Sequence, residues 1–330
     1  MRIGVNGFGR IGRYFTRLSL EREDMDVVMV NDLAPIETLA HLLKYDSVHG
    51  KLKYDFTIHG NEIHFCNGKK LSFTSEKDPA QINWGAKQVD YVLESTGLFR
   101  SSDKAALHLG DTVKKVVISA PAKGDDVKTV VIGVNDHLLE AEDTVVSNAS
   151  CTTNSAAPLV AVLKEICTIK SAYITTVHSY TSDQRLHDAP HSDLRRARAA
   201  AQSIVPTSTG AAKALTRIFP ELDGFMGGCG IRVPVPDGSL TDLTIVVDKA
   251  PTVAEINAAF KKASETNLKG ILSYIEDPVV SVDILDNPHS CIFDSLLTSV
   301  IGDNMIKVVG WYDNEAGYSN RLIDLMTKLK

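Results

Sequence analysis

A glycine-rich turn after the first apolar run limits the fold of this chain more than any other feature. Residues 2–6 (RIGVN) read as a short strand, and Gly7, Gly9 and Gly12 follow in the spacing G-x-G-x-x-G before a helical pattern over residues 13–20. Such glycines permit a tight turn, a close approach of backbone to a pyrophosphate, and tight packing of the helix on the strand. Alone, the motif is weak evidence for a nucleotide site.

The acidic residue that ends the next apolar run strengthens this prediction. Residues 27–32 (VVMVND) read as a second buried strand, and Asp32 lies 20 residues after Gly12, where an acid can bind the adenosine ribose hydroxyls. A carboxylate at this point repels a 2′-phosphate, so NAD is favoured over NADP. The plainer interpretation of Asp32, an ordinary turn residue at a strand end, carries little weight beside the glycine motif.

The remaining pattern predicts two domains of different construction. A helix over residues 36–45 and short strands near 53–58, 62–65, 71–74 and 91–94 indicate an α/β unit. Later segments are β-rich, with one covering helix over residues 252–266, which indicates a mainly antiparallel sheet; they are residues 231–248, 279–284, 291–300 and 305–312. We expect a first domain of residues 1–150, a second of 151–315, and a C-terminal helix, 316–330, that returns to the first.

Composition excludes several classes of protein. A length of 330 residues with 44% apolar content suits two separate cores, and a net charge of −6 argues against nucleic acid as the primary partner. The five cysteines are odd in number and contain no C-x-x-C pair, so neither a disulfide framework nor a zinc site is expected. We find no secretory pattern and no apolar run of membrane-spanning length, and therefore expect a cytoplasmic protein without metal or membrane contact.

One cysteine lies where a predicted strand ends and a predicted helix begins. Val145 and Val146 are followed by residues with turn and capping side chains, Ser150 among them, and then by Cys151 and an Ala/Leu/Val-rich helical stretch. Free N–H groups and the helix dipole at such a position favour thiolate over thiol. A buried, inert thiol is the simpler interpretation unless a base lies near.

His178 is the candidate base. It ends the strand-like run of residues 171–177 and opens a polar, basic segment, residues 179–202, of the length that usually carries function. A lone histidine is more often structural, so its role depends on its neighbours.

Two motifs together resemble one family closely. The segments SNASCTTN (147–154) and TTVHSYT (175–181), whose cysteine and histidine lie 27 residues apart, resemble phosphorylating glyceraldehyde-3-phosphate dehydrogenase, and the likeness extends over the whole chain. The resemblance implies a Rossmann-type doubly wound NAD-binding domain and an α+β catalytic domain. It also implies oxidation of D-glyceraldehyde 3-phosphate with NAD and inorganic phosphate to 1,3-bisphosphoglycerate, through a thioester on Cys151 with His178 as the base. A homotetramer, with residues 179–202 reaching toward a neighbour, is the implied assembly.

The resemblance also assigns binding residues. The implied cofactor contacts are Gly7, Gly9, Arg10, Ile11, Gly12, Asp32, Lys77, Ser119 and Asn314, with Lys77 standing where an arginine is usual. The substrate's own phosphate is assigned to Thr181 and Arg232, and the attacking inorganic phosphate to Ser150, Thr152, Arg196, Thr209 and Gly210. Anion sites of this kind are best built from guanidinium groups, hydroxyls and backbone N–H groups. Simple helix caps are the alternative for the hydroxyls, and a solvated face or subunit contact for arginines of the 179–202 segment.

Two rival functions stay open at this point. An erythrose-4-phosphate dehydrogenase shares the cysteine, the histidine and the fold but hydrolyses its thioester, although TSTGAAK (207–213) resembles the phosphorylating enzymes. A binding protein, or a redox sensor acting through Cys151, is the rival outside enzymes. Ala316, where the family commonly has an aromatic residue, and Ser182, where asparagine is usual, depart from the family pattern without removing a catalytic group.

Overall fold

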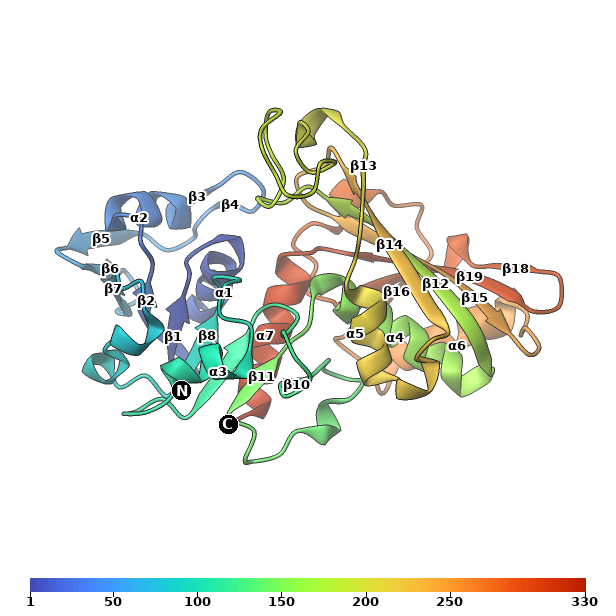
Figure 1. Cartoon of the computed structure of the whole chain (residues 1–330), viewed down its shortest axis with the longest axis horizontal. Coiled ribbons are helices and arrows are strands. Elements are labelled where there is room, and N and C mark those ends of the chain that lie inside the picture. Colours follow the sequence, from blue (N-terminus) through green and yellow to red (C-terminus); the bar gives the residue numbers. More distant parts are fainter. The chain divides into compact units, whose positions relative to one another are not determined.

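The computed structural model describes residues 1–330, which form two compact units (Figure 1). Unit 1 comprises residues 1–130, 138–149 and 319–330. Unit 2 comprises residues 131–137 and 150–318. The α/β fold class predicted from the sequence is confirmed, because unit 1 is built on a mainly parallel sheet and unit 2 on a mainly antiparallel one.

Unit 1 is a doubly wound sheet. Its strands run in the order β10-β11-β9-β8-β1-β2-β7-β6-β5, parallel from β10 to β7 and antiparallel at β6 and β5. Their bounds are β1 Arg2–Asn6, β2 Asp26–Asn31, β5 Phe56–His59, β6 Glu62–Phe65, β7 Lys70–Thr74, β8 Tyr91–Glu94, β9 Lys115–Ile118, β10 Lys128–Thr129 and β11 Val145–Ser147. A separate hairpin pairs β3, Tyr45–Asp46, with β4, Gly50–Lys51. The central strands are buried apolar runs, as parallel strands covered on both faces require.

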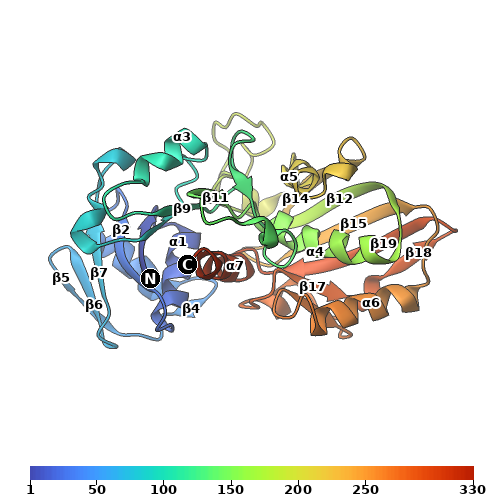
Figure 2. The same cartoon turned by 90° about the horizontal axis from the view of Figure 1, so that it is seen from below.

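Helices cover both faces of this sheet (Figure 2). They are α1 (Arg10–Leu20), α2 (Ile36–Lys44), α3 (Ser102–Ala105) and short 3₁₀ turns at Pro79–Gln81, Trp84–Lys87 and Ala106–His108. The direction in which successive strands are added across the sheet reverses at β1, since β2 lies on one side of it and β8 on the other. Ligands of open α/β sheets bind at the carboxyl edge beside such a switch point, so this edge is where a nucleotide site is expected.

Unit 2 carries the second sheet, ordered β13-β14-β12-β15-β19-β17-β16, with β18 also paired to β19. The strands are β12 Ile169–Ser179, β13 Val205–Thr207, β14 Met226–Val233, β15 Ser239–Val247, β16 Leu272–Ile275, β17 Cys291–Asp294, β18 Ser299–Ile301 and β19 Met305–Tyr312. Most pairs are antiparallel, but β12 runs parallel to β14, and β16 to β17. Alternate residues of β15 are buried, which shows that only one face of the sheet is covered.

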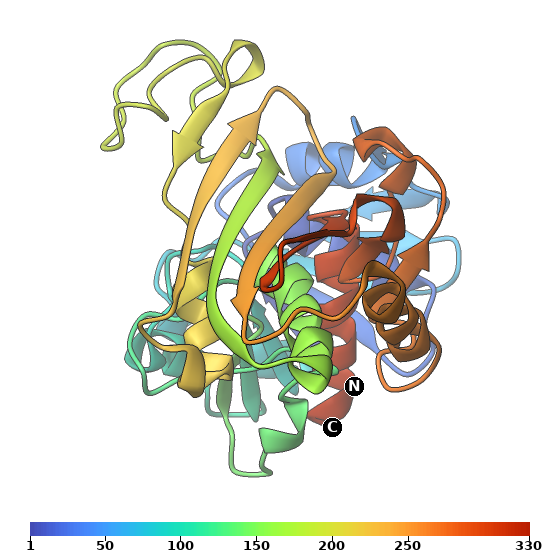
Figure 3. The ribbon, with the colours of Figure 1, turned by 90° about the vertical axis from the view of Figure 1, so that its right-hand side faces the viewer.

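The covering layer of unit 2 is helical (Figure 3). Helix α4 (Cys151–Ile166) packs on β12, β15, β17 and β19 and contacts both α5 (Ala211–Ile218) and α6 (Val253–Glu265). Eleven of its 16 residues are buried, so α4 is the central helix of this layer. The final helix, α7, spans Ala316–Lys328, and in unit 1 the hydroxyl of Tyr91 donates to the carbonyl of Leu329 at 3.2 Å. None of the helices combines the length and apolar character needed to cross a bilayer.

One predicted strand is wrong. Residues 279–284 contain a 3₁₀ turn, Ser281–Ile284, instead of a strand. The backbone N–H of Val280 donates to Asp283 Oδ2 at 2.8 Å, while Val280 and Val282 remain exposed. A local side-chain bond to the backbone therefore replaces pairing with a neighbouring strand, a competition that β-branched composition does not reveal.

Candidate functional site

Cys151 occupies the first turn of the central helix of unit 2. Strand β11 ends at Ser147, Ala149 takes a left-handed conformation (φ +56°), and Ser150 caps α4 by accepting the N–H of Thr153 at 3.1 Å. Non-glycine residues in this conformation are strained and concentrate at functional sites. The predicted cap at Ser150 is confirmed, and it fixes the thiol at the end of the helix where backbone N–H groups are free.

The structure places His178 beside this cysteine. Sγ of Cys151 lies 3.4 Å from Nε2 of His178, which ends the buried strand β12. On the other side of the ring, Nδ1 lies 2.8 Å from the carbonyl oxygen of Ser179. An N–H on Nδ1 that donates to this carbonyl leaves Nε2 as the acceptor for the thiol proton. The pair thus has the geometry of a nucleophile and its general base.

Burial sets the charge of the pair. It raises the pKa of the Cys151 thiol to about 11, although Arg232 and the N–H of Thr152 oppose the shift. It lowers the pKa of His178 to about 3, and Arg232 lowers that pKa further. A lone charge on either group is therefore disfavoured, contrary to the expectation that the helix terminus alone stabilises the thiolate. Transfer of the proton from Sγ to Nε2 creates both charges together, each beside its counter-charge, so the pair titrates as one unit.

Arg232 is the cation nearest to this pair. It faces His178 in the parallel register of β12 and β14, and its Nη1 contacts Nδ1 of His178 and donates to Ser179 O at 3.0 Å. Burial lowers the pKa of Arg232, and Arg196 lowers it further, whereas Cys151 and Tyr312 raise it. Two guanidinium groups therefore act on one small region, and an anion bound there would relieve their repulsion.

The hydroxyl of a buried tyrosine links the helix that carries Cys151 to the strand that carries His178. The hydroxyl of Tyr312 lies 2.9 Å from Thr152 Oγ1 on α4 and 2.8 Å from Thr176 Oγ1 on β12. Its ring also packs edge-on against His178. Tyr312 and Thr176 were not predicted as site residues, because the only signal in the sequence is the need of a buried tyrosine hydroxyl for a hydrogen-bond partner.

The other residues assigned to anion binding have local partners. Arg196 donates to Thr207 Oγ1 from Nε at 2.9 Å and from Nη2 at 2.6 Å, and its Nη1 pairs with Asp183. Thr209 Oγ1 accepts the N–H of Ala211 at 3.2 Å at the start of α5. Gly210 caps that helix, and a Cβ added to it would meet nothing within 4 Å, so its surroundings are open. Thr181 begins the turn closed by the N–H of Gln184 on its carbonyl at 2.9 Å.

Unit 1 holds a pocket at the carboxyl edge of its sheet. The pocket has a volume of about 360 Å³ and is lined by Asn6, Gly7, Gly9, Asn31, Asp32, Leu33, Glu76, Lys77, Ser95, Thr96, Leu98 and Phe99. Gly7 has φ +91°, and a Cβ there would lie 2.8 Å from the N atom of Thr96, so only glycine fits. The half-exposed carboxylate of Asp32 accepts the N–H of Phe8 at 2.7 Å and that of Ala34 at 3.0 Å.

Four assigned cofactor residues of unit 1 are not among those that line this pocket. Arg10 begins α1 but forms a bidentate pair with Asp46, at 2.7 and 3.1 Å. Ile11 lies in the same turn of α1 and Gly12, the third glycine of the motif, follows it in the helix. Ser119 comes directly after β9, where its N–H donates to the carbonyl of Glu94 at 2.9 Å.

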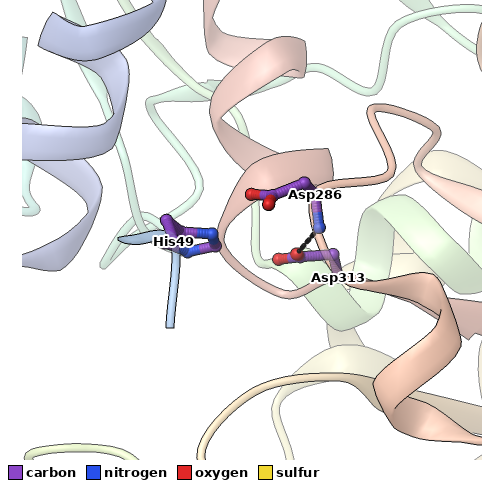
Figure 4. Close-up of side chains that lie close together, drawn as sticks. All are labelled: His49, Asp286 and Asp313. Carbon is purple, nitrogen blue, oxygen red and sulfur yellow. Dashed lines mark hydrogen bonds between the residues drawn. The ribbon is translucent and has the colours of Figure 1, made fainter. Parts of the chain in front are cut away.

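Asn314, which was also assigned to the cofactor, is oriented within unit 2. Its Oδ1 accepts hydrogen bonds from the hydroxyls of Ser179 at 2.9 Å and Ser239 at 2.6 Å. The backbone beside it is fixed by Asp313, whose carboxylate accepts the N–H of Asp286 at 2.8 Å (Figure 4) and that of Glu315 at 2.8 Å. With its oxygen so engaged, Asn314 presents its amide nitrogen as a donor.

Comparison with known proteins decides the family. Residues 1–102 match the NAD binding domain of glyceraldehyde 3-phosphate dehydrogenase, and residues 150–314 match the C-terminal domain of the same enzyme. The chain belongs to the glyceraldehyde 3-phosphate dehydrogenase family. Glyceraldehyde-3-phosphate dehydrogenase 2 of Streptomyces avermitilis is 52% identical over 327 residues, which is 98% of this chain and 97% of the relative.

Two further relatives are similar to this chain over nearly its whole length. Glyceraldehyde-3-phosphate dehydrogenase of Priestia megaterium is 51% identical over 98% of this chain and 97% of its own. The enzyme of Mycobacterium avium is 53% identical over 99% of this chain and 97% of its own. Within the family, unit 1 carries the NAD-binding domain, and the pocket at its carboxyl edge is formed in that part of the chain. The predicted cofactor, NAD, is therefore confirmed.

Proposed function

We propose that this chain oxidises D-glyceraldehyde 3-phosphate with NAD and inorganic phosphate to 1,3-bisphosphoglycerate, through a thioester on Cys151. The contact between Cys151 Sγ and His178 Nε2, with Arg232 beside it, is the observation that carries this proposal. Membership of the family and the names of the relatives support the same reaction.

The residues of unit 1 fit NAD. Gly7 and Gly9 leave the turn before α1 without side chains, and a Cβ on Gly9 would meet nothing within 4 Å, so a pyrophosphate has room to approach the backbone. Asp32 has carboxylate surface accessible in the pocket for ribose hydroxyls. We assign the adenosine half of the cofactor to these residues and to Lys77, and the nicotinamide carboxamide to the amide nitrogen of Asn314.

Catalysis begins with the thiol proton. In the tautomer whose N–H on Nδ1 points to Ser179 O, Nε2 accepts the proton of Cys151 and the thiolate attacks the aldehyde carbon. The imidazolium then returns this proton to the alkoxide oxygen, which gives a hemithioacetal and leaves His178 neutral again. We assign stabilisation of the developing oxyanion to backbone N–H groups at the start of α4, and each such donor lowers a barrier by about 3 kcal/mol. Tyr312 fixes the position of α4 relative to β12 through its bonds to Thr152 and Thr176.

Oxidation then leaves an acyl group on sulfur. Bound NAD supplies the hydride acceptor. His178 takes the hydroxyl proton of the hemithioacetal, and the carbonyl reforms as a thioester on Cys151. The thioester retains the energy of oxidation if water is kept away from it.

Inorganic phosphate completes the reaction by attacking the thioester carbon and releasing Cys151. We assign the substrate phosphate to Thr181 and Arg232, and the attacking phosphate to Ser150, Thr152, Arg196, Thr209 and Gly210. The electrostatic effect of Arg196 on Arg232 supports two neighbouring anion sites, because positively charged groups held together favour bound anions. A phosphate already in position outcompetes water as the nucleophile.

Initial rates of NADH formation at 340 nm test this proposal. With glyceraldehyde 3-phosphate, we expect sustained turnover that requires phosphate or arsenate and disappears in Cys151→Ser but not in Cys229→Ser. Sustained turnover without phosphate would instead indicate a hydrolysing dehydrogenase, and erythrose 4-phosphate would then be the substrate to try. NAD binding without turnover would reject the proposed reaction and favour a sensing role.

We also propose a homotetramer. Unit 2 exposes large apolar side chains on its sheet and on the 179–202 segment, among them Tyr173 (51% exposed), Phe225 (59%), Leu186 (77%) and Leu194 (80%). Apolar surface of this kind is typical of a protein–protein interface. Sedimentation equilibrium should give four times the chain mass of 35.9 kDa; a monomer at micromolar concentration would reject the assembly.

A further inference from the structure

A buried hydrogen-bond network adjoins the nucleotide pocket of unit 1. The carboxylate of Glu94 ends β8, and Oε2 accepts hydrogen bonds from Nδ2 of Asn6 at 2.6 Å and from Nε2 of His108 at 3.0 Å. The side chains of Glu94 and His108 have no solvent exposure. The proposed reaction uses neither residue.

The other oxygen of Glu94 holds the loop that follows it. Oε1 accepts the backbone N–H of Thr96 at 2.9 Å and also the hydroxyl of Thr96. Glu94 therefore receives four donors, which is what a buried carboxylate requires. The carboxylate of Glu94 therefore fixes both Thr96 in the loop and Asn6 at the end of β1.

His108 is held in a single tautomer. The indole N–H of Trp84 donates to Nδ1 of His108 at 3.2 Å, so the ring proton is on Nε2, where it donates to Glu94. Phe99, which lines the pocket, packs edge-on against the same ring. The imidazole is therefore a fixed donor to the carboxylate.

The network continues across the strand ends that form the pocket. Asn6, at the end of β1, accepts Nδ2 of Asn31, at the end of β2, at 2.8 Å. Asn31 in turn binds the backbone of Glu76, accepting its N–H at 2.8 Å and donating to its carbonyl at 2.9 Å. The network of Glu94 thus connects the residues that directly precede Gly7, Asp32 and Lys77.

The Thr96 loop and the glycine turn are in direct contact. Gly7 packs so closely on Thr96 that no side chain fits between them, and the hydroxyl of Ser95 donates to Gly7 O at 2.6 Å. A shift of Thr96 would consequently move the turn that receives the pyrophosphate. Binding sites gain affinity when such elements are held in place before the ligand arrives.

We propose that Glu94 and His108 are positioning residues that preform the adenosine-side pocket of the NAD site. The inference rests on the proposed placement of NAD against Gly7, Gly9 and Asp32. Neither residue touches the ligand: Glu94 acts through Thr96 and Asn6, and His108 acts by donating to Glu94.

The test compares Glu94→Gln with wild type in binding ADP-ribose, which lacks nicotinamide. Glutamine keeps the shape of the side chain but adds two N–H groups and removes the charge, so the donors of Asn6 and His108 lose part of their acceptor. We expect about tenfold weaker binding of ADP-ribose and of NAD, measured by calorimetry, with a larger change in the KM for NAD than in kcat. His108→Phe, which loses the donor, should weaken binding more than His108→Gln, which retains an N–H.

Val116→Ala is the control for simple destabilisation, because Val116 is buried in the same unit but does not line the pocket. It should lower the melting temperature without changing ADP-ribose affinity. Unchanged affinity in Glu94→Gln, while Asp32→Ala weakens binding, would overturn the positioning role alone. Unchanged affinity in both variants would overturn the cofactor placement and the positioning role with it.

Discussion

Sγ of Cys151 and Nε2 of His178 lie 3.4 Å apart, although 27 residues separate them in the chain. Cys151 lies in the first turn of α4, and His178 lies near the C-terminal end of β12. Tyr312 links these two elements through hydrogen bonds to Thr152 and Thr176. The chemistry of the site therefore depends on how α4 packs on the sheet.

His178→Asn should reduce kcat by about a thousandfold, because a positioned general base contributes roughly 10²–10⁴ in rate. Binding of NAD should persist, since the assigned adenosine-side residues are untouched. Single-turnover kinetics with glyceraldehyde 3-phosphate measures the loss. A variant with nearly full activity would show that His178 is not the base.

The stability of the protein should fall on both sides of neutral pH. His178 has a folded pKa of about 3, below its unfolded value of about 6.5, so the unfolded chain binds more protons and stability is lost as pH falls below 6.5. Cys151 has a folded pKa of about 11, above its ordinary value of 9.0, so stability is lost as pH rises from 9 toward 11. Each group contributes at most about 1.4 kcal/mol per pH unit.

Urea unfolding of wild type and His178→Asn between pH 5 and 7.5 isolates the histidine contribution. Wild type should lose more free energy of unfolding on acidification than the variant does. Parallel pH profiles for the two proteins would contradict the buried neutral state of His178.

Arg232→Ala should lower kcat/KM for glyceraldehyde 3-phosphate by about a hundredfold, since charge-assisted hydrogen bonds contribute about 1.5–3 kcal/mol. Unphosphorylated glyceraldehyde should be affected much less. Rates with the two substrates give the comparison, and an equal loss on both would mean that Arg232 acts through His178, which it contacts.

Arg196→Ala should raise the KM for inorganic phosphate by about tenfold and leave the KM for the aldehyde nearly constant, because the assigned site receives the attacking phosphate. Arg198→Ala is the matched control: Arg198 lies on the same segment but pairs with the exposed Asp188 at 2.9 Å. Phosphate titrations at saturating aldehyde measure both. An unaltered phosphate dependence in Arg196→Ala would remove this residue from the site.

Ser239→Ala should weaken NAD binding several-fold without altering ADP-ribose binding. The hydroxyl of Ser239 donates to Asn314 Oδ1 at 2.6 Å, and a single hydrogen bond of this type is worth about 1 kcal/mol. Calorimetry with the two ligands separates this effect from that of Glu94→Gln, which weakens both. Equal weakening of both ligands would show that Ser239 does not act on the nicotinamide side.

Sequence reasoning succeeded where local chemistry decides the structure. The helix after Gly9, the cap at Ser150 and the strand end before Asp32 each depend on a few consecutive residues, and the structure has all three. It failed at residues 279–284, where a bond from Val280 to Asp283 forms a 3₁₀ turn in a β-branched segment. There a short-range polar contact prevailed over the intrinsic preference of the side chains.

The glycine turn, the capped cysteine, the α/β character of the first domain and the family could be predicted from the residues alone. Which side chains meet depends on the packing of distant segments. His178 lies beside Cys151, Arg232 faces His178 across a parallel strand pair, and Glu94 bonds to His108. Packing also sets the protonation of the Cys151–His178 pair, because burial opposes a lone charge on either residue. The physical reason is that desolvation and long-range contacts depend on packing between distant segments, which no local pattern of residues specifies.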